Sequence, residues 1–289
     1  MPSLPTADGR TLAWREVGSG PVLLCHPGGP GSSAAYFGEL PELAAQRTLV
    51  LLDPRGTGGS DRPADPAGYE LEQYADDVED VREHLGLARM DLLGHSHGGF
   101  VAMAWGGAHP ERVGRLVLAS TVPRFTDDIR GLQMKRVGAH HGKPYFEDAM
   151  AALQAHQRGE YRDDEELGEL RRRESRLFAP VGVDPGDAAA IGEALGRAGT
   201  NADALRHFNH RIAATMDLRP QLARIEAPTL VVGGAGDVFS PGLQEVADAL
   251  PNATLAVLPG LDHFPFLEGP EHRAQWAGVV LEFLRQGQI

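Results

Sequence analysis

A short glycine–serine motif between two apolar segments constrains the fold more than any other feature of the chain. Residues 94–98 read Gly-His-Ser-His-Gly, a G-x-S-x-G pattern centred on Ser96. The apolar run 90–93 predicts a buried strand before the motif, and residues 99–108 predict a helix after it. In a strand–turn–helix of this kind the serine occupies a sharp, strained turn, and the flanking glycines avoid collisions with the neighbouring strand or helix. Without that context the motif would indicate only a flexible loop with a capping serine. Ser96 is therefore a candidate nucleophile.

Strand and helix signals alternate on both sides of this motif. The expected strands cover residues 21–25, 49–52, 90–93, 115–119, 229–232 and 254–258, and the expected helices cover 70–85, 99–108, 243–250 and 270–285. A hairpin turn at Asp8-Gly9 precedes them. Alternation of this type predicts an α/β fold with a mostly parallel central sheet and helices on both faces. Residues 124 to about 216 show no convincing strand, so we expect a helical insertion there.

Composition limits the classes of partner. A chain of 289 residues is long enough for a large core in one or two domains. Its net charge of −13 disfavours nucleic acid and anionic membrane surfaces. The single cysteine, Cys25, lies in an apolar run and is expected to be buried. The first residues lack the pattern of a signal peptide, and no run reaches the roughly 18 apolar residues of a membrane span. We expect a cytoplasmic protein without a membrane or nucleic-acid partner; the sequence does not indicate an oligomeric state.

Two later strand ends supply the groups that a nucleophilic serine requires. A serine hydroxyl needs a base, and the base needs an orienting acid. In parallel sheets such groups gather beyond the carboxyl ends of the strands. Asp237 follows the strand 229–232 on a glycine-rich loop, and His263 follows the strand 254–258. Ser96, Asp237 and His263 stand in the serine–acid–histidine order of the α/β-hydrolases.

Each of these assignments has an alternative. Asp237 could cap the helix that follows it, and His263 could be a packed histidine, one of twelve in the chain. Asp262 competes for the acid role, although adjacent residues rarely point their side chains at each other. Asp127 or Asp128, beyond an earlier strand, is a weaker candidate for the same role.

A glycine-rich loop follows the first expected central strand. Residues 26–31 read His-Pro-Gly-Gly-Pro-Gly, and the glycines allow a substrate to approach the backbone N–H groups. We expect the N–H of Gly29 and the N–H of His97, which follows the serine, to form an oxyanion hole. The alternative for residues 28–31 is a tight turn without a function.

Three segments together resemble a known family. Residues 26–31, residues 53–60 (Asp-Pro-Arg-Gly-Thr-Gly-Gly-Ser) and the Ser96 motif are similar to the proline iminopeptidase branch of the α/β-hydrolase superfamily. The resemblance covers about residues 10–122 and 217–289. It implies an α/β-hydrolase core at residues 1–122 and 217–289, a helical cap at residues 123–216 that closes over the site, and a serine hydrolase without a metal or an organic cofactor.

The sequence departs from that branch in ways that bear on the substrate. Pro27 is an addition to the usual loop, and the Ser96 motif has a histidine where the aminopeptidases often carry an aromatic residue. The aminopeptidases of the branch hold a substrate amine with cap glutamates and an acid near the triad aspartate. Here apolar residues follow Asp237, and residues 206–211 carry bases. Glu147, Asp148 and the acidic run 163–166 could supply acids, or could form solvated helix faces.

These departures favour an ester, a lactone or another amide with an apolar acyl part over the release of N-terminal proline. The substrate is expected to be a small molecule or a short peptide. The residues that could line its pocket are Gly28, Phe125, Phe146, Phe239 and Phe264. These phenylalanines could equally belong to the core.

Other function classes are less favoured. A small-molecule binder without turnover, or a cofactor-free lyase or oxygenase, is left open by the histidines on either side of Ser96. Dehalogenase and epoxide hydrolase chemistry would need an aspartate at this position. His140-His141 has no third ligand at metal spacing. Residues 56–59 lack the context of a nucleotide-binding loop, and the arginines 171–173 alternate with acids rather than form a basic patch.

Overall fold

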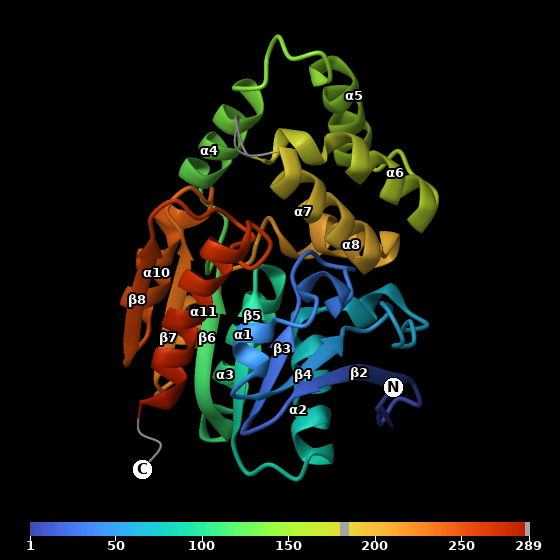
Figure 1. Ribbon diagram of the computed structural model, residues 1–289. Helices are drawn as coiled ribbons and strands as arrows, with labels where there is room; N and C mark the ends of the chain where they lie inside the picture. Colours follow the sequence, from blue (N-terminus) through green and yellow to red (C-terminus); the bar gives the residue numbers. More distant parts are fainter. Residues whose placement is uncertain (180–184, 287–289) are drawn as a thin grey trace.

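The molecule is built on one eight-stranded sheet (Figure 1). The computed structural model describes residues 1–179 and 185–286. In the order β1-β2-β4-β3-β5-β6-β7-β8, the pairs β1–β2 and β2–β4 are antiparallel and the other neighbours are parallel. The strands are β1 (Ser3–Pro5), β2 (Thr11–Gly18), β3 (Val22–His26), β4 (Thr48–Asp53), β5 (Met90–His95), β6 (Val113–Ala119), β7 (Thr229–Gly234) and β8 (Ala253–Leu258). The predicted fold class and each predicted strand are confirmed.

Helices cover both faces of this sheet. One face packs against α2 (Leu71–His84), α3 (His97–Ala108), α9 (Arg219–Leu222) and α10 (Ser240–Ala249). The other face packs against the 3-10 turn η1 (Ala34–Phe37), α1 (Pro41–Ala44) and α11 (Pro270–Arg285). Short 3-10 turns η2 (Pro66–Tyr69) and η3 (Pro110–Arg112) complete the connections.

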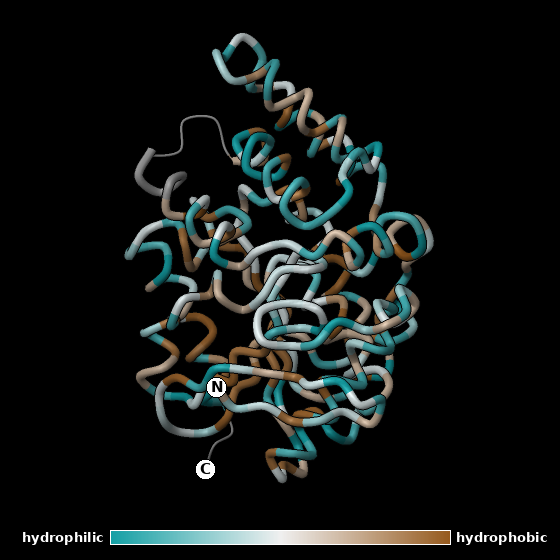
Figure 2. Tube along the Cα trace, turned by 90° about the vertical axis from the view of Figure 1, so that its right-hand side faces the viewer, coloured by the Kyte–Doolittle hydropathy of each residue, from teal (hydrophilic) through white to brown (hydrophobic). Residues whose placement is uncertain are grey.

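Successive side chains of each strand point to opposite faces of the sheet, which explains why helices cover both faces. On β4, Val50 and Leu52 belong to one apolar cluster, whereas Leu49 and Leu51 belong to the cluster on the opposite face. A strand buried on both faces needs a continuous apolar run, as the sequence of β4 provides. In Figure 2 the hydrophobic segments concentrate in this sheet region.

A group of helices lies over the edge where the parallel strands end (Figure 1). They are α4 (Asp127–Gly138), α5 (Phe146–Gln157), α6 (Asp164–Glu174), η4 (Ser175–Leu177), α7 (Pro185–Ala198), α8 (Ala202–His207) and the π-helical turn η5 (Phe208–Ile212). Two small apolar clusters pack within this group, one around Leu153 and the other around Leu167. No strand occurs among the described residues between β6 and β7. The loops after the strands therefore open beneath these helices.

Polar contacts join the overlying helices to the sheet. Arg136 of α4 pairs with Asp262 at 2.8 Å and donates to the carbonyl of Gly236. At the other side of the molecule, Asn201 Nδ2 donates to the carbonyl of Gly56 and to the hydroxyl of Tyr69, both at 2.9 Å. These contacts hold the helices against loops that follow the strands.

Candidate active site

The turn between β5 and α3 holds Ser96 in a strained backbone conformation. Ser96 has φ 54° and ψ −115°, a positive φ that side chains disfavour. Its N–H donates to the carbonyl of Ala119 on β6, and its carbonyl accepts from the N–H of Gly99, both at 2.9 Å. A Cβ at Gly94 would overlap the backbone of Gly98, and a Cβ at Gly98 would overlap the backbone at the end of β3. The tight packing explains why both positions are glycine.

Three side chains from separate loops meet at this turn. His263, in the loop after β8, places its Nε2 3.1 Å from Ser96 Oγ and its Nδ1 2.9 Å from Asp237 Oδ2. Asp237, in the loop after β7, also accepts the N–H of Phe239 at 3.0 Å. Its side chain is 0% exposed. A proton on Nδ1 toward Asp237 leaves the Nε2 lone pair directed at the Ser96 hydroxyl.

The two ionisable groups of this set shift each other's pKa. Burial alone would raise the pKa of Asp237, but the His263 imidazole and the hydrogen bonds to the carboxylate hold it below its ordinary value. Burial alone would lower the pKa of His263, but the charge of Asp237 and their hydrogen bond raise it above its ordinary value. A histidine raised in this way can accept and hold a proton.

The backbone N–H groups of Gly29 and His97 are the ones that the sequence predicts as an oxyanion hole. Among residues 1–179 and 185–286, the N–H groups of Gly29 and His97 have no hydrogen-bond acceptor. The N–H of Gly28 is not free, because it donates to the hydroxyl of Tyr36. A Cβ at Gly28 would lie 2.7 Å from Ser96 Cβ, so this loop lies directly against the serine. The start of α3 adds a favourable dipole for negative charge.

A second chain of hydrogen bonds runs beneath Ser96. Tyr36 Oη lies 2.9 Å from His95 Nδ1, and His95 Nε2 lies 2.8 Å from the carbonyl of His263. Burial lowers the pKa of His95 to about 3, so the ring is neutral. Only one direction then satisfies every group: the Gly28 N–H donates to Tyr36, Tyr36 donates to His95, and His95 donates to the His263 carbonyl. This chain links the glycine-rich loop to the loop that bears the histidine.

Aromatic rings surround the imidazole of His263. The rings of Phe239 and Phe264 have centroids 5.3 and 4.9 Å from that of His263, and Phe125 is 6.0 Å from Phe239. The ring centroid of Phe208 lies 5.3 Å from that of His97. The sequence did not single out Phe208, because most of the residues around it are basic. These rings form an apolar wall beside Ser96.

Phe146 lies apart from this wall. It begins α5 and packs against His141, with ring centroids 5.3 Å apart, and against the small cluster around Leu153. The structure therefore brings together Phe125, Phe239 and Phe264 but not Phe146.

Comparison with known proteins identifies the family. A family model described as the alpha/beta hydrolase fold matches residues 21–270. The chain belongs to this family. Among its curated α/β-hydrolase relatives, a 2-(acetamidomethylene)succinate hydrolase of Mesorhizobium japonicum is 28% identical, over 90% of this chain and 88% of that protein. A proline iminopeptidase of Lactobacillus helveticus is 27% identical, over 92% of this chain and 90% of that one. The resemblance to the proline iminopeptidase branch is confirmed.

Solved structures of a hydrolase and an esterase match nearly the whole chain. A hydrolase from Pseudomonas aeruginosa has a TM-score of 0.71 and 28% identity, covering 98% of this chain and 97% of that one. An esterase from a Rhodococcus species has a TM-score of 0.75 and 24% identity, covering 99% and 98%. Because the Rhodococcus esterase is only 24% identical, its match shows a shared fold and nothing about the reaction.

Asp262 and Asp127 pair with groups other than the His263 imidazole. Asp262 Oδ1 accepts from Arg136 and from the backbone N–H of His263, each at 2.8 Å. The side chain of Asp127 is 99% exposed and pairs with Arg130, and Asp128 is exposed.

Of the candidate acids over the sheet, Asp148 and Asp163 contact other groups of the overlying helices, and Glu147 is exposed. Asp148 pairs with Arg173 at 2.6 Å, and Asp163 caps α6 by accepting the N–H of Glu166 at 3.0 Å. Glu174, which the sequence did not single out, is buried and lies 2.7 Å from Nδ1 of His156.

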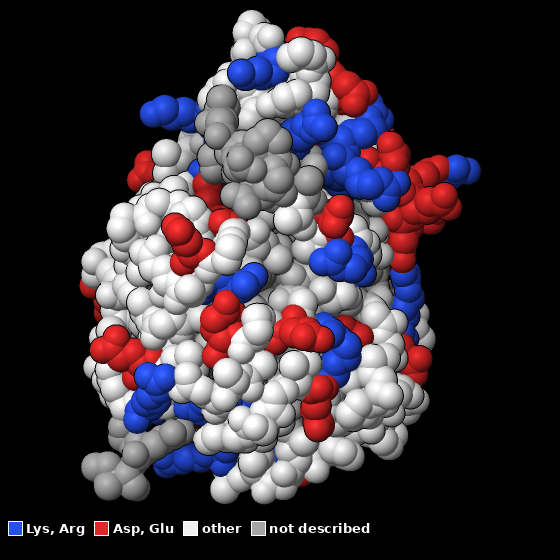
Figure 3. Space-filling view, viewed as in Figure 1, with Lys and Arg blue, Asp and Glu red and all other residues white. Residues whose placement is uncertain are grey.

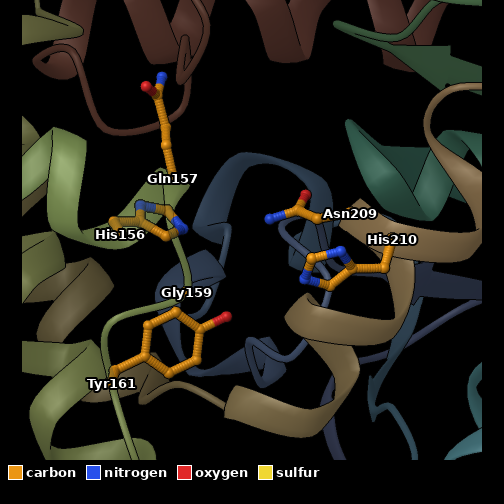
Figure 4. A pocket seen from close by; sticks show the side chains of 6 residues that line it. All are labelled: His156, Gln157, Gly159, Tyr161, Asn209 and His210. Atoms are coloured by element: carbon orange, nitrogen blue, oxygen red, sulfur yellow. The ribbon is translucent and has the colours of Figure 1, made fainter.

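A cleft of about 370 Å³ opens among these overlying helices (Figure 4). Figure 4 shows His156 and His210 facing each other across it. The residues that line it are His156, Gln157, Gly159, Tyr161, Asn209 and His210. Its lining includes none of the three residues that meet at the Ser96 turn.

The described residues hold neither a metal-binding cluster nor a membrane-spanning helix. Residues 1–179 and 185–286 contain no cluster of three or more histidine, cysteine, aspartate or glutamate side chains suited to a metal ion. None of their helices is both long enough and apolar enough to span a membrane.

Proposed function

We propose that this α/β-hydrolase is a serine hydrolase that cleaves an ester, a lactone or an amide through an acyl-enzyme. Ser96 is the nucleophile, His263 the general base and Asp237 the orienting acid. The observation that supports this most is the hydrogen-bonded series in which Ser96 Oγ is 3.1 Å from His263 Nε2 and His263 Nδ1 is 2.9 Å from Asp237.

The proposed reaction has two halves. Ser96 Oγ attacks the carbonyl carbon while its proton passes to His263 Nε2, and the oxyanion accepts hydrogen bonds from the N–H groups of Gly29 and His97. The intermediate expels the alcohol or amine, which takes the proton from His263, and leaves an acyl ester on Ser96. A water molecule, deprotonated by His263, then releases the acid.

We further propose that residues 123–216 act as a cap on a core formed by residues 1–122 and 217–289. The helices of this segment lie over the loops that carry the three residues (Figure 1). The apolar wall of Phe125, Phe239 and Phe264 suits an apolar part of the substrate. Because these helices and rings would exclude water, the hydrogen bonds to the oxyanion would be stronger than in an open site.

Release of N-terminal proline is the second candidate, because proline iminopeptidases are among the relatives. Against it, Asp148 pairs with Arg173, and Glu174 lies against His156, so these acids are engaged rather than available to a substrate amine. The ratio of kcat/KM for proline arylamides to kcat/KM for short acyl esters separates the two functions. We expect the esters to be preferred.

A fluorophosphonate probe tests the proposed function directly. The wild-type protein should be labelled once, and Ser96→Ala should not be labelled. Ser175→Ala, which changes a serine on the overlying helices, is the matched control and should be labelled at the wild-type rate. Labelling that persists in Ser96→Ala would contradict the assignment of the nucleophile.

A further inference from the structure

Three consecutive arginines end α6, and the structure gives them different surroundings. Charged side chains of both signs gather over α5 and α6 (Figure 3). Arg172 pairs with Glu169 at 2.5 Å, and Arg173 pairs with Asp148 at 2.6 Å. Arg171 has neither a hydrogen-bond acceptor nor an ion-pair partner in the part of the chain that the structure describes. Of the three guanidinium groups, only that of Arg171 is without a partner among residues 1–179 and 185–286.

This guanidinium lies against the glycine-rich loop beside Ser96. A Cβ built at Gly29 would be 3.5 Å from Arg171 Nη2. The preceding residue, Gly28, would place its Cβ 2.7 Å from Ser96 Cβ. Arg171 thus reaches from the overlying helices to the loop that bears a proposed oxyanion donor. Arg171, Gly29 and Ser96 are each partly exposed.

The environment of Arg171 favours pairing with an anion. Burial lowers the pKa of the guanidinium, and Glu174, one turn further along α6, is the only acid that counteracts this among the described residues. The Oε1 of Glu174 already contacts His156 at 2.7 Å. An arginine keeps its charge even where its surroundings disfavour it, so an anion that paired with the partly exposed guanidinium of Arg171 would be favoured there.

The position of Arg171 near the end of α6 does not account for it. The helix dipole favours cations in the last turn, but Arg172 and Arg173 occupy the same turn and have acidic partners at the surface. What distinguishes Arg171 is the loop that it faces. An unpaired cation beside a nucleophile is a binding group for an anion on the substrate.

We infer that Arg171 binds a carboxylate of the substrate, a few bonds from the carbonyl that Ser96 attacks. This inference rests on the proposed function and narrows its substrate class to esters, lactones or amides that carry a free carboxylate. The guanidinium fork holds both carboxylate oxygens, while the apolar wall of Phe125, Phe239 and Phe264 contacts the rest of the substrate. Arg171 is in this account a specificity residue.

A pair of matched esters tests the inference. One is the mono-p-nitrophenyl ester of adipic acid, and the other is the same compound with its free carboxylate converted to the methyl ester. Wild-type kcat/KM should favour the carboxylate by at least tenfold, because charge-assisted bidentate bonds have about this strength. Arg171→Met should reduce this selectivity ratio to near one. Arg172→Met is the control from the same helix turn and should keep the wild-type ratio.

Two results would overturn the inference: a wild-type ratio below about three, or a ratio in Arg171→Met equal to that of wild type. Because the ratio compares two substrates on one variant, a general loss of activity does not mimic the expected result. Thermal unfolding of Arg171→Met shows whether the variant is folded.

A binding measurement separates this inference from the proposed function. In the Ser96→Ala background, calorimetry should give a Kd for the carboxylate ester at least tenfold lower than for the methyl ester. Ser96→Ala combined with Arg171→Met should lose that difference. If fluorophosphonate labelling and turnover both fail while this preference persists, the proposed function is wrong and the carboxylate site remains. Equal affinities for the two esters would reject the site.

Discussion

At the scale of single residues, His263 is the group on which the proposed chemistry depends. Its imidazole contacts Ser96 on one side and Asp237 on the other. Burial is the largest single influence on its pKa and lowers it, but the charge of Asp237, the hydrogen bond between the two groups and nearby acids together raise the pKa above its ordinary value. Because a general base must be neutral before it accepts a proton, activity should rise as the pH passes the pKa of His263.

Asp237→Asn tests this coupling. In the wild type the acid limb of kcat/KM should have its midpoint above about 6.5, the ordinary pKa of histidine. In Asp237→Asn the charge of Asp237 is gone, while burial and the weaker raising effects of Asp262 and Glu268 remain, so the midpoint should fall relative to wild type. Turnover should also drop by about 10³–10⁴-fold, because the imidazole loses its orienting acid. The measurement is a pH profile of kcat/KM on an acyl ester.

Asp127→Asn is the control for this prediction, because Asp127 is an exposed acid beyond β6. It should retain the wild-type profile. An Asp237→Asn variant with near-normal turnover, or with an unshifted midpoint, would move the acid role to another residue.

At the scale of elements, Tyr36 connects three parts of the molecule that bear on the reaction. It lies in η1, receives the N–H of Gly28 and contacts His95 at the end of β5, and His95 contacts the carbonyl of His263. A change at Tyr36 should therefore affect both the glycine-rich loop, which bears the proposed oxyanion donor Gly29, and the loop that bears His263, without contacting Ser96.

Tyr36→Phe removes one hydroxyl and leaves the Gly28 N–H and His95 Nδ1 without partners. Unsatisfied buried groups of this kind cost about 1–3 kcal/mol each. We expect a lower Tm, by several degrees, together with a fall in kcat that exceeds the change in KM. Tyr161→Phe is the matched control, since the Tyr161 hydroxyl has no hydrogen bond to a described side chain or backbone group. Unchanged Tm and kcat in Tyr36→Phe would show that the chain of hydrogen bonds has no role in positioning.

The element scale also explains which residues the sequence could reveal. The apolar runs of β3 to β8 and the order Ser96, Asp237, His263 are local patterns, and parallel strands necessarily bring their carboxyl ends to one edge. The arginines 171–173 are different. Successive residues on a helix point about 100° apart, so only one of three adjacent side chains faces a given neighbour. Which of the three arginines faces the glycine-rich loop depends on how α6 packs over the sheet, and that packing cannot be predicted from the local sequence.

At the scale of the whole molecule, the arrangement of the sheet could be predicted from the sequence, whereas the packing of the overlying helices could not. The strands are fixed by continuous apolar runs and by glycines that permit close packing, as at Gly94 and Gly98. Of the overlying helices, α5 and α6 pack in small separate clusters, whereas α4, α7, α8 and η5 also add apolar residues to the clusters of the sheet. Polar contacts such as Arg136 with Asp262 supplement this packing. Phe146 illustrates the difference, because it packs within those helices rather than against the wall at His263.

The account as a whole depends on a covalent bond forming at one oxygen atom. The most direct measurement is to mix the protein with a p-nitrophenyl ester, quench it in acid during turnover, and map its peptides by mass spectrometry. The acyl mass should appear on the peptide that contains Ser96 and on no other, and His263→Ala should not accumulate it. Steady release of nitrophenol without acylation of that peptide, or with the acyl group on a different residue, would contradict the mechanism.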